Sequence, residues 1–114
     1  MSPFMIHVSF LRNSALAFFP FILFKNKASK TDAVLLNHER IHLKQQLELL
    51  IIPFYFIYIL QYLINLIIYR NHYKAYINIV FEKEAFHNER YLNYLQHRKA
   101  FAFMKFFYTG TVGV

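Results

Sequence analysis

The sequence predicts a small, mainly α-helical single domain, residues 1–114, with a short β-hairpin or edge strand at its N-terminus. Three observations support this fold class. The chain of 114 residues is long enough for one modest hydrophobic core. It contains only two glycines, both within the last five residues, which disfavours turn-rich β structure. The third observation is the long stretch from Ala33 to Ile52, which follows the capping side chains of Thr31 and Asp32 and lacks both Gly and Pro.

Residues 4–24 are predicted to form an apolar hairpin or a membrane anchor. Two apolar runs, Met5–Leu11 and Ala15–Phe24, flank a short polar turn, as expected for paired strands. Pro20 cannot donate a ladder hydrogen bond, so the second run must be an edge strand or be interrupted there. An exposed strand edge could bind an extended peptide by β-augmentation. The alternative is a signal peptide or signal anchor with Arg12 as its basic flank.

Residues 32–52 form the predicted helix around which the chain is organised, because it carries the pentapeptide His38-Glu39-Arg40-Ile41-His42. Residues four apart lie on one face of a helix, so His38 and His42 can bind the same metal ion. Glu39 can then accept a proton from a metal-bound water as a general base. Gln45 follows His42 by three residues on the same face and can orient a ligand. The alternative is an ordinary helix with two solvated or core histidines.

Residues 54–69 are predicted to form an apolar helix without a formal charge. Its polar side chains recur every three or four residues and make one stripe, formed by Tyr55, Tyr58, Tyr62, Asn65 and Tyr69. The opposite face is hydrocarbon and suits lipid or another apolar surface; it consists of Phe56, Ile59, Leu60, Leu63 and Ile67. A core helix of a soluble bundle is the alternative.

Residues 75–98 are predicted to form a third helix, in which carboxylates gather. A catalytic zinc site uses three protein ligands and a water, so two histidines need one further ligand. Glu82 and Glu84 are the candidates, and at about 100° per residue only one of them can face the histidines. Glu84 can equally be a surface carboxylate that pairs with Lys83 or Arg98. Glu89 lies two turns from Glu82 on the same face, where it can hold a ligand or a cation, but a solvated role is expected.

The C-terminal half also contains side chains that could stabilise the oxyanion formed on a peptide carbonyl during hydrolysis. The candidates are Tyr73, Tyr76 and His87. The tail, residues 99–114, combines phenylalanines with lysines and resembles a basic membrane-surface segment, with frayed ends beyond Thr109.

Composition restricts the ligands and the partners. The chain has no cysteine, so a metal must be held by His and carboxylate groups. The net charge of +7 could indicate nucleic acid, but the cations gather around the apolar runs and form no regular basic face. This distribution favours an anionic membrane lipid surface and predicts no nucleic-acid partner.

Two motifs in sequence resemble those of a known class of enzymes. They are His38-Glu39-x-x-His42-x-x-Gln45 and Phe81-Glu82-x-Glu84-Ala85, separated by an aromatic run that contains Pro53. The pair is similar to the HExxH metallopeptidases, or zincins, and within them to the gluzincins, whose third ligand is a glutamate on a later helix. Over residues 35–98 the pattern looks closest to small uncharacterised bacterial membrane-associated proteins with an HExxHxxQ…FExEA pattern.

The resemblance implies a zincin-like helical domain that binds Zn²⁺ through His38, His42 and Glu82, with Glu39 as the catalytic residue. It further implies hydrolysis of a peptide or protein substrate by a protein associated with the bacterial inner membrane. Phe86 departs from the gluzincin frame, in which an acidic or amide residue is common at that position.

Two other function classes use the same residues. Glu39-x-x-His42 and Glu84-x-x-His87 are two Glu-x-x-His pairs, as in di-iron carboxylate redox proteins, although the second set of carboxylates is missing. The other class is a non-catalytic membrane scaffold that keeps the motif.

The topology of the apolar region follows from the metal hypothesis. If Leu47–Tyr69 were one straight transmembrane helix, His42 and Glu82 would be separated by roughly 30 Å of hydrocarbon. One ion could not then bind both. A break at Pro53 removes the conflict and predicts an up-down-up arrangement that brings Glu82 to the level of His42.

Overall fold

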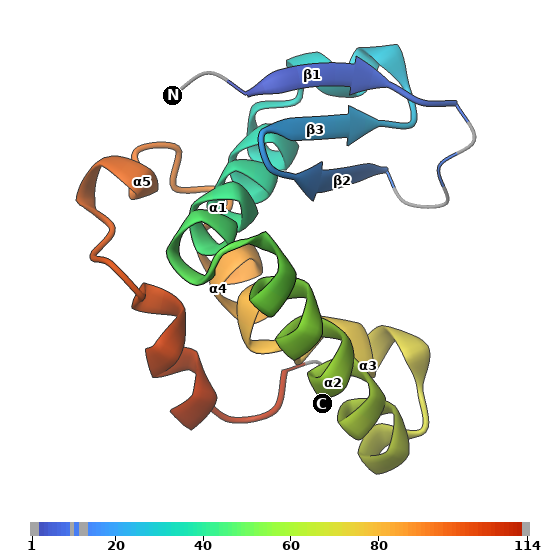
Figure 1. Ribbon diagram of the computed structural model, residues 1–114, viewed down its shortest axis with the longest axis vertical. Helices are drawn as coiled ribbons and strands as arrows, with labels where there is room; N and C mark the ends of the chain where they lie inside the picture. The colour runs from blue at the N-terminus through green and yellow to red at the C-terminus, as the bar shows by residue number, and fades with distance from the viewer. Residues whose placement is uncertain (1–2, 10, 12–13, 113–114) are drawn as a thin grey trace.

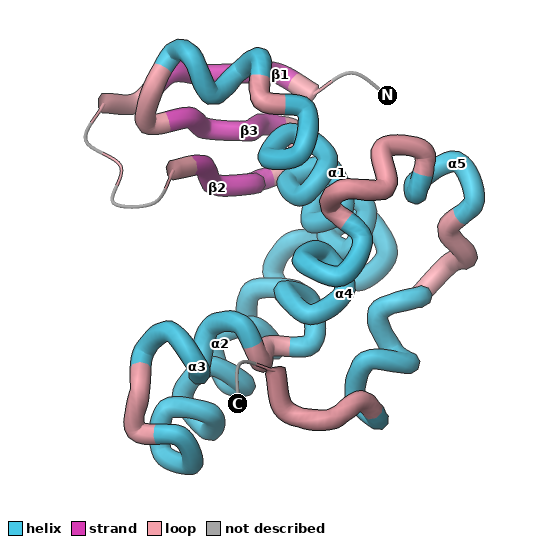
Figure 2. Tube along the Cα trace, turned by 180° about the vertical axis from the view of Figure 1, so that it is seen from behind, coloured by secondary structure: helices cyan, strands magenta, loops and turns pink. Residues whose placement is uncertain are grey.

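The computed structural model describes residues 3–9, 11 and 14–112 and shows a mainly helical fold with a three-stranded mixed sheet, as predicted (Figure 1). In chain order the elements are β1 Phe4–His7, β2 Ala15–Phe18, β3 Phe21–Phe24, the 3-10 helix η1 Lys27–Thr31, α1 Ala33–Leu49, α2 Ile51–Tyr69, α3 His72–Ile77, α4 Val80–Asn88, α5 Tyr94–His97 and the 3-10 helix η2 Ala102–Tyr108. The sheet lies beside α1 at one end of the molecule, and α2 and α3 lie at the other end (Figures 1 and 2).

The N-terminal strands pair differently from the predicted hairpin. The strand order is β1-β3-β2, with β1 parallel and β2 antiparallel to β3. The second apolar run folds back on itself because Phe19 and Pro20 separate β2 from β3, so Pro20 interrupts the run as expected. β1 pairs with the remaining side of β3, which leaves β2 as the edge next to α1. Arg12 and Asn13 of the predicted turn lie outside the described residues.

Apolar side chains hold the sheet on α1. Ala17, Ile22 and Phe24 form a buried cluster with Leu43, which removes their hydrocarbon from water. At the start of α1 the Asp32 carboxylate accepts a hydrogen bond from the backbone N–H of Leu35 at 3.1 Å and so caps the helix. The helix with the pentapeptide therefore has a fixed start and one face fixed by the sheet.

The break between α1 and α2 lies at Leu50 and not at Pro53. Leu50 has a φ of 66°, a positive value that takes its backbone out of the helical conformation. Pro53 lies in the first turn of α2, where a missing N–H costs no helical hydrogen bond. The predicted break is thus present, three residues earlier than the proline suggests.

α2 presents the two faces that its sequence predicts. On the polar stripe, the Tyr55 hydroxyl donates to the Ala17 carbonyl, and the Asn65 amide donates to the Ala75 carbonyl at 3.1 Å. The opposite face is exposed, and the exposed fractions of Phe56, Ile59, Leu60, Leu63 and Ile67 are 68%, 54%, 48%, 50% and 77%. By length and composition α2 could cross a membrane. Only 11% of the residues in its most apolar 18-residue stretch are buried.

The single helix predicted over residues 75–98 is wrong, because the region forms α3, α4 and α5. The first break is stabilised by Asn78, whose side chain donates to the Lys74 carbonyl at 2.8 Å and bonds both backbone groups of Val112. Val112 lies 34 positions from Asn78, so local propensity could not indicate this contact at the break. The redirected α4 packs against α1 and turns Glu82 toward it.

The C-terminal tail is more integrated than predicted. Phe103 and Phe106 of η2 are buried in a core cluster with Phe81 and Phe54. Beyond Thr109, where frayed residues are expected, Thr111 pairs with Tyr69 and Val112 bonds Asn78. Only part of the tail, including Phe101, Phe107 and Tyr108, is exposed in the way a membrane-surface segment requires.

Candidate metal centre

The middle of α1 places His38, Glu39 and His42 in one buried cluster that could hold a metal ion. The two imidazoles lie one helical turn apart, and their Nε2 atoms are 3.2 Å from each other. Their exposed fractions are 4% and 5%, so water competes little for these nitrogens. The HExxH spacing therefore has the geometry that the sequence predicts.

Glu82 of α4 meets both histidines. Its Oε1 atom lies 3.0 Å from His38 Nε2 and 2.9 Å from His42 Nε2. Three ligand atoms bound to a tetrahedral zinc at about 2.0–2.1 Å lie about 3.3 Å from one another. The triangle of 2.9, 3.0 and 3.2 Å is close to that size, so the three atoms fit a common small cation.

The outer nitrogens of both imidazoles are already used as donors. His38 Nδ1 lies 2.8 Å from the Glu89 carboxylate, and His42 Nδ1 lies 2.8 Å from the Gln45 carbonyl oxygen. Both oxygens accept, so each Nδ1 carries the hydrogen and each neutral ring leaves its Nε2 lone pair free. Three acceptors, the two Nε2 atoms and Glu82 Oε1, then face one another, and this arrangement requires a cation or a proton between them.

The acid–base properties of the metal-free site agree with this picture. Burial alone would lower the pKa of His42, but the charge of Glu82 and its hydrogen bond raise that pKa to about 9. Burial opposes ionisation of Glu82, yet the two histidines lower its pKa well below the ordinary value. Burial raises the pKa of Glu39 above its ordinary 4.5, in the direction that a general base near neutral pH requires. These shifts favour a positive charge between the three acceptor atoms.

Glu84 supports the site from behind and is not the surface carboxylate of the alternative interpretation. It is 0% exposed and accepts from the Gln45 amide at 2.9 Å, from the Tyr94 hydroxyl at 2.6 Å and from Arg98. Arg98 forms two further bonds to Glu48 on α1, at 2.8 and 3.0 Å. The sequence indicates Arg98 as a partner of Glu84, but it does not indicate that the Glu84 carboxylate is buried. Glu82 and Glu84 face different directions, as predicted.

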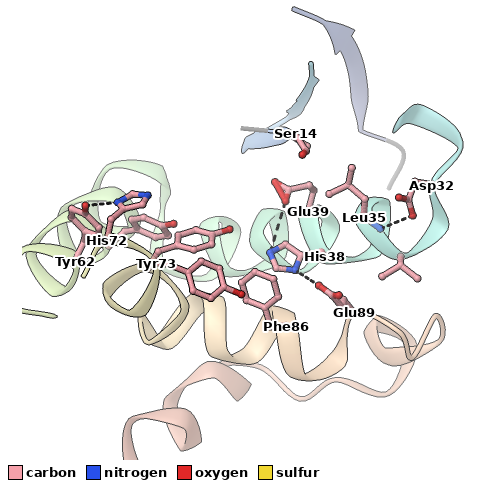
Figure 3. A pocket seen from close by; sticks show the side chains of 14 residues that line it. Ser14, Asp32, Leu35, His38, Glu39, Tyr62, His72, Tyr73, Phe86 and Glu89 are labelled. Atoms are coloured by element: carbon pink, nitrogen blue, oxygen red, sulfur yellow. Dashed lines mark hydrogen bonds and ion pairs between the residues drawn. The ribbon is translucent and has the colours of Figure 1, made fainter. Parts of the chain in front are cut away.

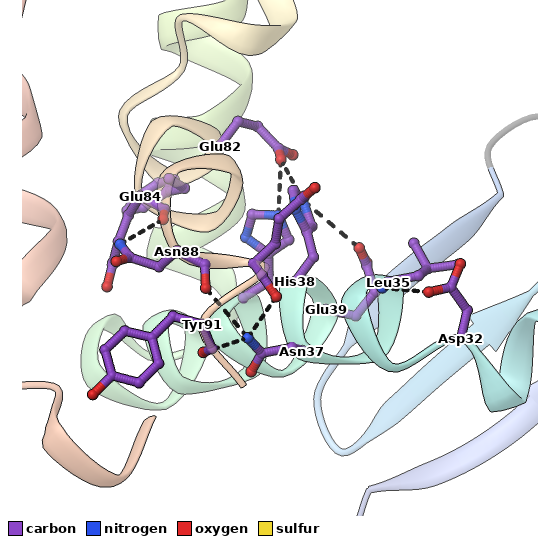
Figure 4. A network of polar contacts seen from close by, with 12 residues as sticks. Asp32, Leu35, Asn37, His38, Glu39, Glu82, Glu84, Asn88 and Tyr91 are labelled. Atoms are coloured by element: carbon purple, nitrogen blue, oxygen red, sulfur yellow. Dashed lines mark hydrogen bonds and ion pairs between the residues drawn. The ribbon is translucent and has the colours of Figure 1, made fainter. Parts of the chain in front are cut away.

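The expectation that Glu89 is solvated is wrong, because its carboxylate bonds His38 Nδ1. Its loop is held by Asn37, whose amide donates to the carbonyls of Asn88, Glu89 and Tyr91 at 3.3, 2.8 and 3.0 Å (Figure 4). Sequence reasoning missed Asn37. The residue immediately precedes the motif, but its partners lie more than fifty positions away.

A cleft with a volume of about 870 Å³ opens beside the cluster (Figure 3). Glu39 and His38 line it from α1, while Tyr58 and Tyr62 line it from α2 and Tyr73 from α3. Tyr76 also lines this cleft, so two of the three predicted oxyanion candidates, Tyr73 and Tyr76, line the same cleft as Glu39.

Two further side chains change the predicted site. The sequence places Tyr58 in the polar stripe of α2 and gives it no role at the metal site. In the structure its hydroxyl donates a hydrogen bond to Glu82 Oε2 at 2.6 Å. His87 is not in the cleft, because it lines a different cavity with Lys83 and packs against Phe106. With Glu84 held by Arg98 and His87 facing elsewhere, the two Glu-x-x-His pairs do not converge on one di-iron site.

Comparisons with protein-family models, with curated proteins and with solved structures find no match to this chain. The resemblance to zincins therefore rests on the motif and on the buried His38-Glu39-His42 cluster that it forms.

Proposed function

We propose that this protein is a zinc-dependent, zincin-type hydrolase of peptide bonds, with His38, His42 and Glu82 as metal ligands and Glu39 as the general base. The observation that carries the proposal is the convergence of three acceptor atoms within 3.2 Å, with both Nδ1 atoms engaged as donors. Nitrogen and carboxylate ligands in this number are typical of catalytic zinc. His38 and Glu39 both line the cleft, so a substrate in the cleft would be next to this ligand set.

The roles of the side chains follow from their positions. Zinc in such a site lowers the pKa of a bound water to about 7. Glu39 does not belong to the triangle, and its carboxylate lies 3.9 Å from His38 Nε2 and lines the cleft, where it could accept a proton from a water that zinc would activate. Tyr58 holds the second oxygen of Glu82, which leaves Oε1 for the metal. Tyr76 and Tyr73 could donate to the oxyanion that forms on a peptide carbonyl.

The edge of β2 supports a peptide as the substrate. Ser14 O accepts from Lys25 N, so the alternate residues Ala15 and Ala17 direct their backbone groups away from β3. Ala17 O is already taken by Gln46 and Tyr55, whereas the edge at Ala15 borders the cleft. An extended peptide could pair with β2 there and pass in front of Glu39.

Metal analysis combined with two substitutions tests this proposal. Purified protein should contain about one zinc per chain. Glu39→Gln should keep the zinc and lose hydrolysis by at least about 100-fold, because the amide cannot accept the proton. His42→Ala should lose both zinc and hydrolysis, because it removes a ligand. Loss of zinc in Glu39→Gln would overturn the assignment of Glu39. Failure of the chain to take up any metal would leave the non-catalytic scaffold.

A further inference from the structure

We propose that the outer face of α2 lies on an anionic lipid bilayer and that the cleft acts on polypeptide segments next to a membrane anchor. The first part of the proposal, the membrane contact, does not depend on zinc-dependent hydrolysis. The second part, the class of substrate, rests on the proposed function.

The outer face of α2 is a continuous apolar surface. Eight of its large side chains are between 48% and 81% exposed, namely Ile52, Phe56, Ile59, Leu60, Leu63, Ile64, Ile67 and Ile68. α2 has no formal charge along its 19 residues. An exposed apolar surface of this extent indicates a site of interaction with a protein or a membrane.

The distribution of charge favours an anionic lipid surface as the occupant. Each of the six carboxylates is engaged within the fold: Glu39 and Glu82 at the metal centre, Glu84 and Glu48 with Arg98, Glu89 with His38 and Asp32 as a helix cap. The Arg98 side chain is buried with two of these carboxylates, whereas Arg70 at the end of α2 and Arg40, Lys44, Lys99 and Lys105 elsewhere are exposed. The exterior therefore presents many cations and no free carboxylate among the described residues, and Arg70 directly follows the apolar face of α2, which suits anionic headgroups over an acyl layer.

α2 is expected to lie in the bilayer surface and not to cross the bilayer. Its inner face bonds Glu82 through Tyr58 and packs on α4, which carries Glu84 and its ion pair with Arg98. A crossing α2 would bring these charged groups to the depth of the hydrocarbon, at a large free-energy cost. A helix lying in the interface buries only its apolar half and leaves the metal centre in water.

This orientation places the cleft close to the lipid. Tyr58 and Tyr62 on the inner face of α2 form one wall of the cleft, and the lipid would contact the opposite face of the same helix. A helix with its side chains is about 10–12 Å across. An extended chain advances about 3.3 Å per residue, so a segment spans the width of the helix in about 3–4 residues and reaches the cleft soon after it leaves the bilayer. Such segments follow the anchors of membrane proteins and lipoproteins.

Vesicle binding tests the membrane contact without any need for catalysis. The chain contains no tryptophan, so Leu63→Trp and Leu92→Trp each provide a single reporter. Leu63 is on the outer face of α2, and Leu92, in the loop before α5, is similarly exposed at 55%. With vesicles of phosphatidylcholine and phosphatidylglycerol, brominated acyl chains should quench only the reporter at position 63. The double substitution Leu63→Glu and Ile67→Glu should weaken binding at least tenfold, and Leu92→Glu should not. The membrane contact would be overturned if the Leu63→Glu, Ile67→Glu double variant and the Leu92→Glu variant bound vesicles equally well. It would also be overturned if the protein bound nucleic acid but no vesicles.

Photo-crosslinking tests the substrate class. The Glu39→Gln variant, which should hold a substrate without cutting it, is mixed with a designed polypeptide that carries a photoreactive residue five positions after a transmembrane anchor. In vesicles, crosslinks to peptides containing Tyr58 or Tyr62 should be at least tenfold more abundant than with the same segment lacking the anchor. Equal yields would overturn the inference, even if the wild-type protein binds zinc and hydrolyses soluble peptides. Absence of zinc and hydrolysis with preferential crosslinking would instead overturn only the proposed function.

Discussion

At the scale of single residues, both histidines are oriented by glutamates of one segment, residues 84–89. His38 is fixed by Glu89, and His42 is fixed by Gln45, which Glu84 holds in turn. A hydrogen bond at Nδ1 selects the tautomer and makes Nε2 a better ligand. The residues from 84 to 98 thus determine the direction of both rings without entering the triangle of Nε2 and Oε1 atoms.

This division of roles predicts different zinc affinities for two glutamates on α4. Glu82→Gln removes the charged ligand and should weaken zinc binding by at least about 100-fold, whereas Glu84→Gln acts through Gln45 and should weaken it about tenfold. Competition with a chromophoric chelator measures both. Glu48→Gln is the matched control, because it also removes a partner of Arg98 but leaves the bond from Gln45 to Glu84. Equal and mild effects of the Glu82 and Glu84 substitutions would mean that α4 does not complete the site.

The sequence locates the His38-Glu39-His42 cluster, but it does not indicate several of the side chains that surround this cluster. His38 and His42 follow from helical spacing, and Glu82 follows from a motif frame. Glu89, Asn37 and Tyr58 could not be assigned, because their contacts join positions between 24 and 54 residues apart. Such contacts depend on how α1, α2 and α4 cross, and no local pattern specifies these crossings.

At the scale of elements, β2 is positioned by one buried side chain of α1. The amide nitrogen of Gln46 donates to Ala17 O at 2.9 Å, and its oxygen accepts from Phe19 N at 2.7 Å. Gln46 is 1% exposed, so these bonds replace hydration that the strand edge has lost. The contact explains why β2, and not β1, lies beside the metal centre.

Gln46→Met should therefore destabilise the protein by about 1–3 kcal/mol, because Phe19 N–H loses its partner. Ala17 O keeps the Tyr55 hydroxyl, so the loss should be partial. Urea unfolding monitored by circular dichroism measures it. The control is Gln96→Met on the exposed face of α5, which should change the free energy of unfolding by less than about 0.5 kcal/mol. A similar loss in both variants would assign the effect to the residue type and not to the strand contact.

The prediction of elements succeeds where the pattern is local and fails where a distant group intervenes. The stripe of α2 follows from spacing alone. The helix predicted over residues 75–98 divides because Asn78 and the loop after α4 bond to Val112 and Asn37, far away in the chain. Tertiary hydrogen bonds outweigh helix propensity at both places.

At the scale of the whole molecule, the decisive feature is the return of the chain between two motifs forty residues apart. α1 and α4 pack against each other, and the break at Leu50 lets α2 leave α1 and lead back through α3. His42 and Glu82 thereby reach 2.9 Å. A continuous membrane-crossing helix from α1 through α2 would separate them by roughly 30 Å and is incompatible with this contact.

The folded-back arrangement predicts that both ends of α2 are on the same side of a membrane. The chain has no cysteine, so single cysteines can replace Lys44 on α1 and Lys74 on α3. In sealed vesicles, a membrane-impermeant thiol reagent should label both positions from the same side, because in the proposed orientation α2 lies in the interface and does not cross the bilayer. Permeabilised vesicles provide the control for reactivity of each thiol. Labelling from opposite sides would place His42 and Glu82 across the hydrocarbon, so that a metal could be shared only between oppositely inserted chains, and the site within one chain would be excluded.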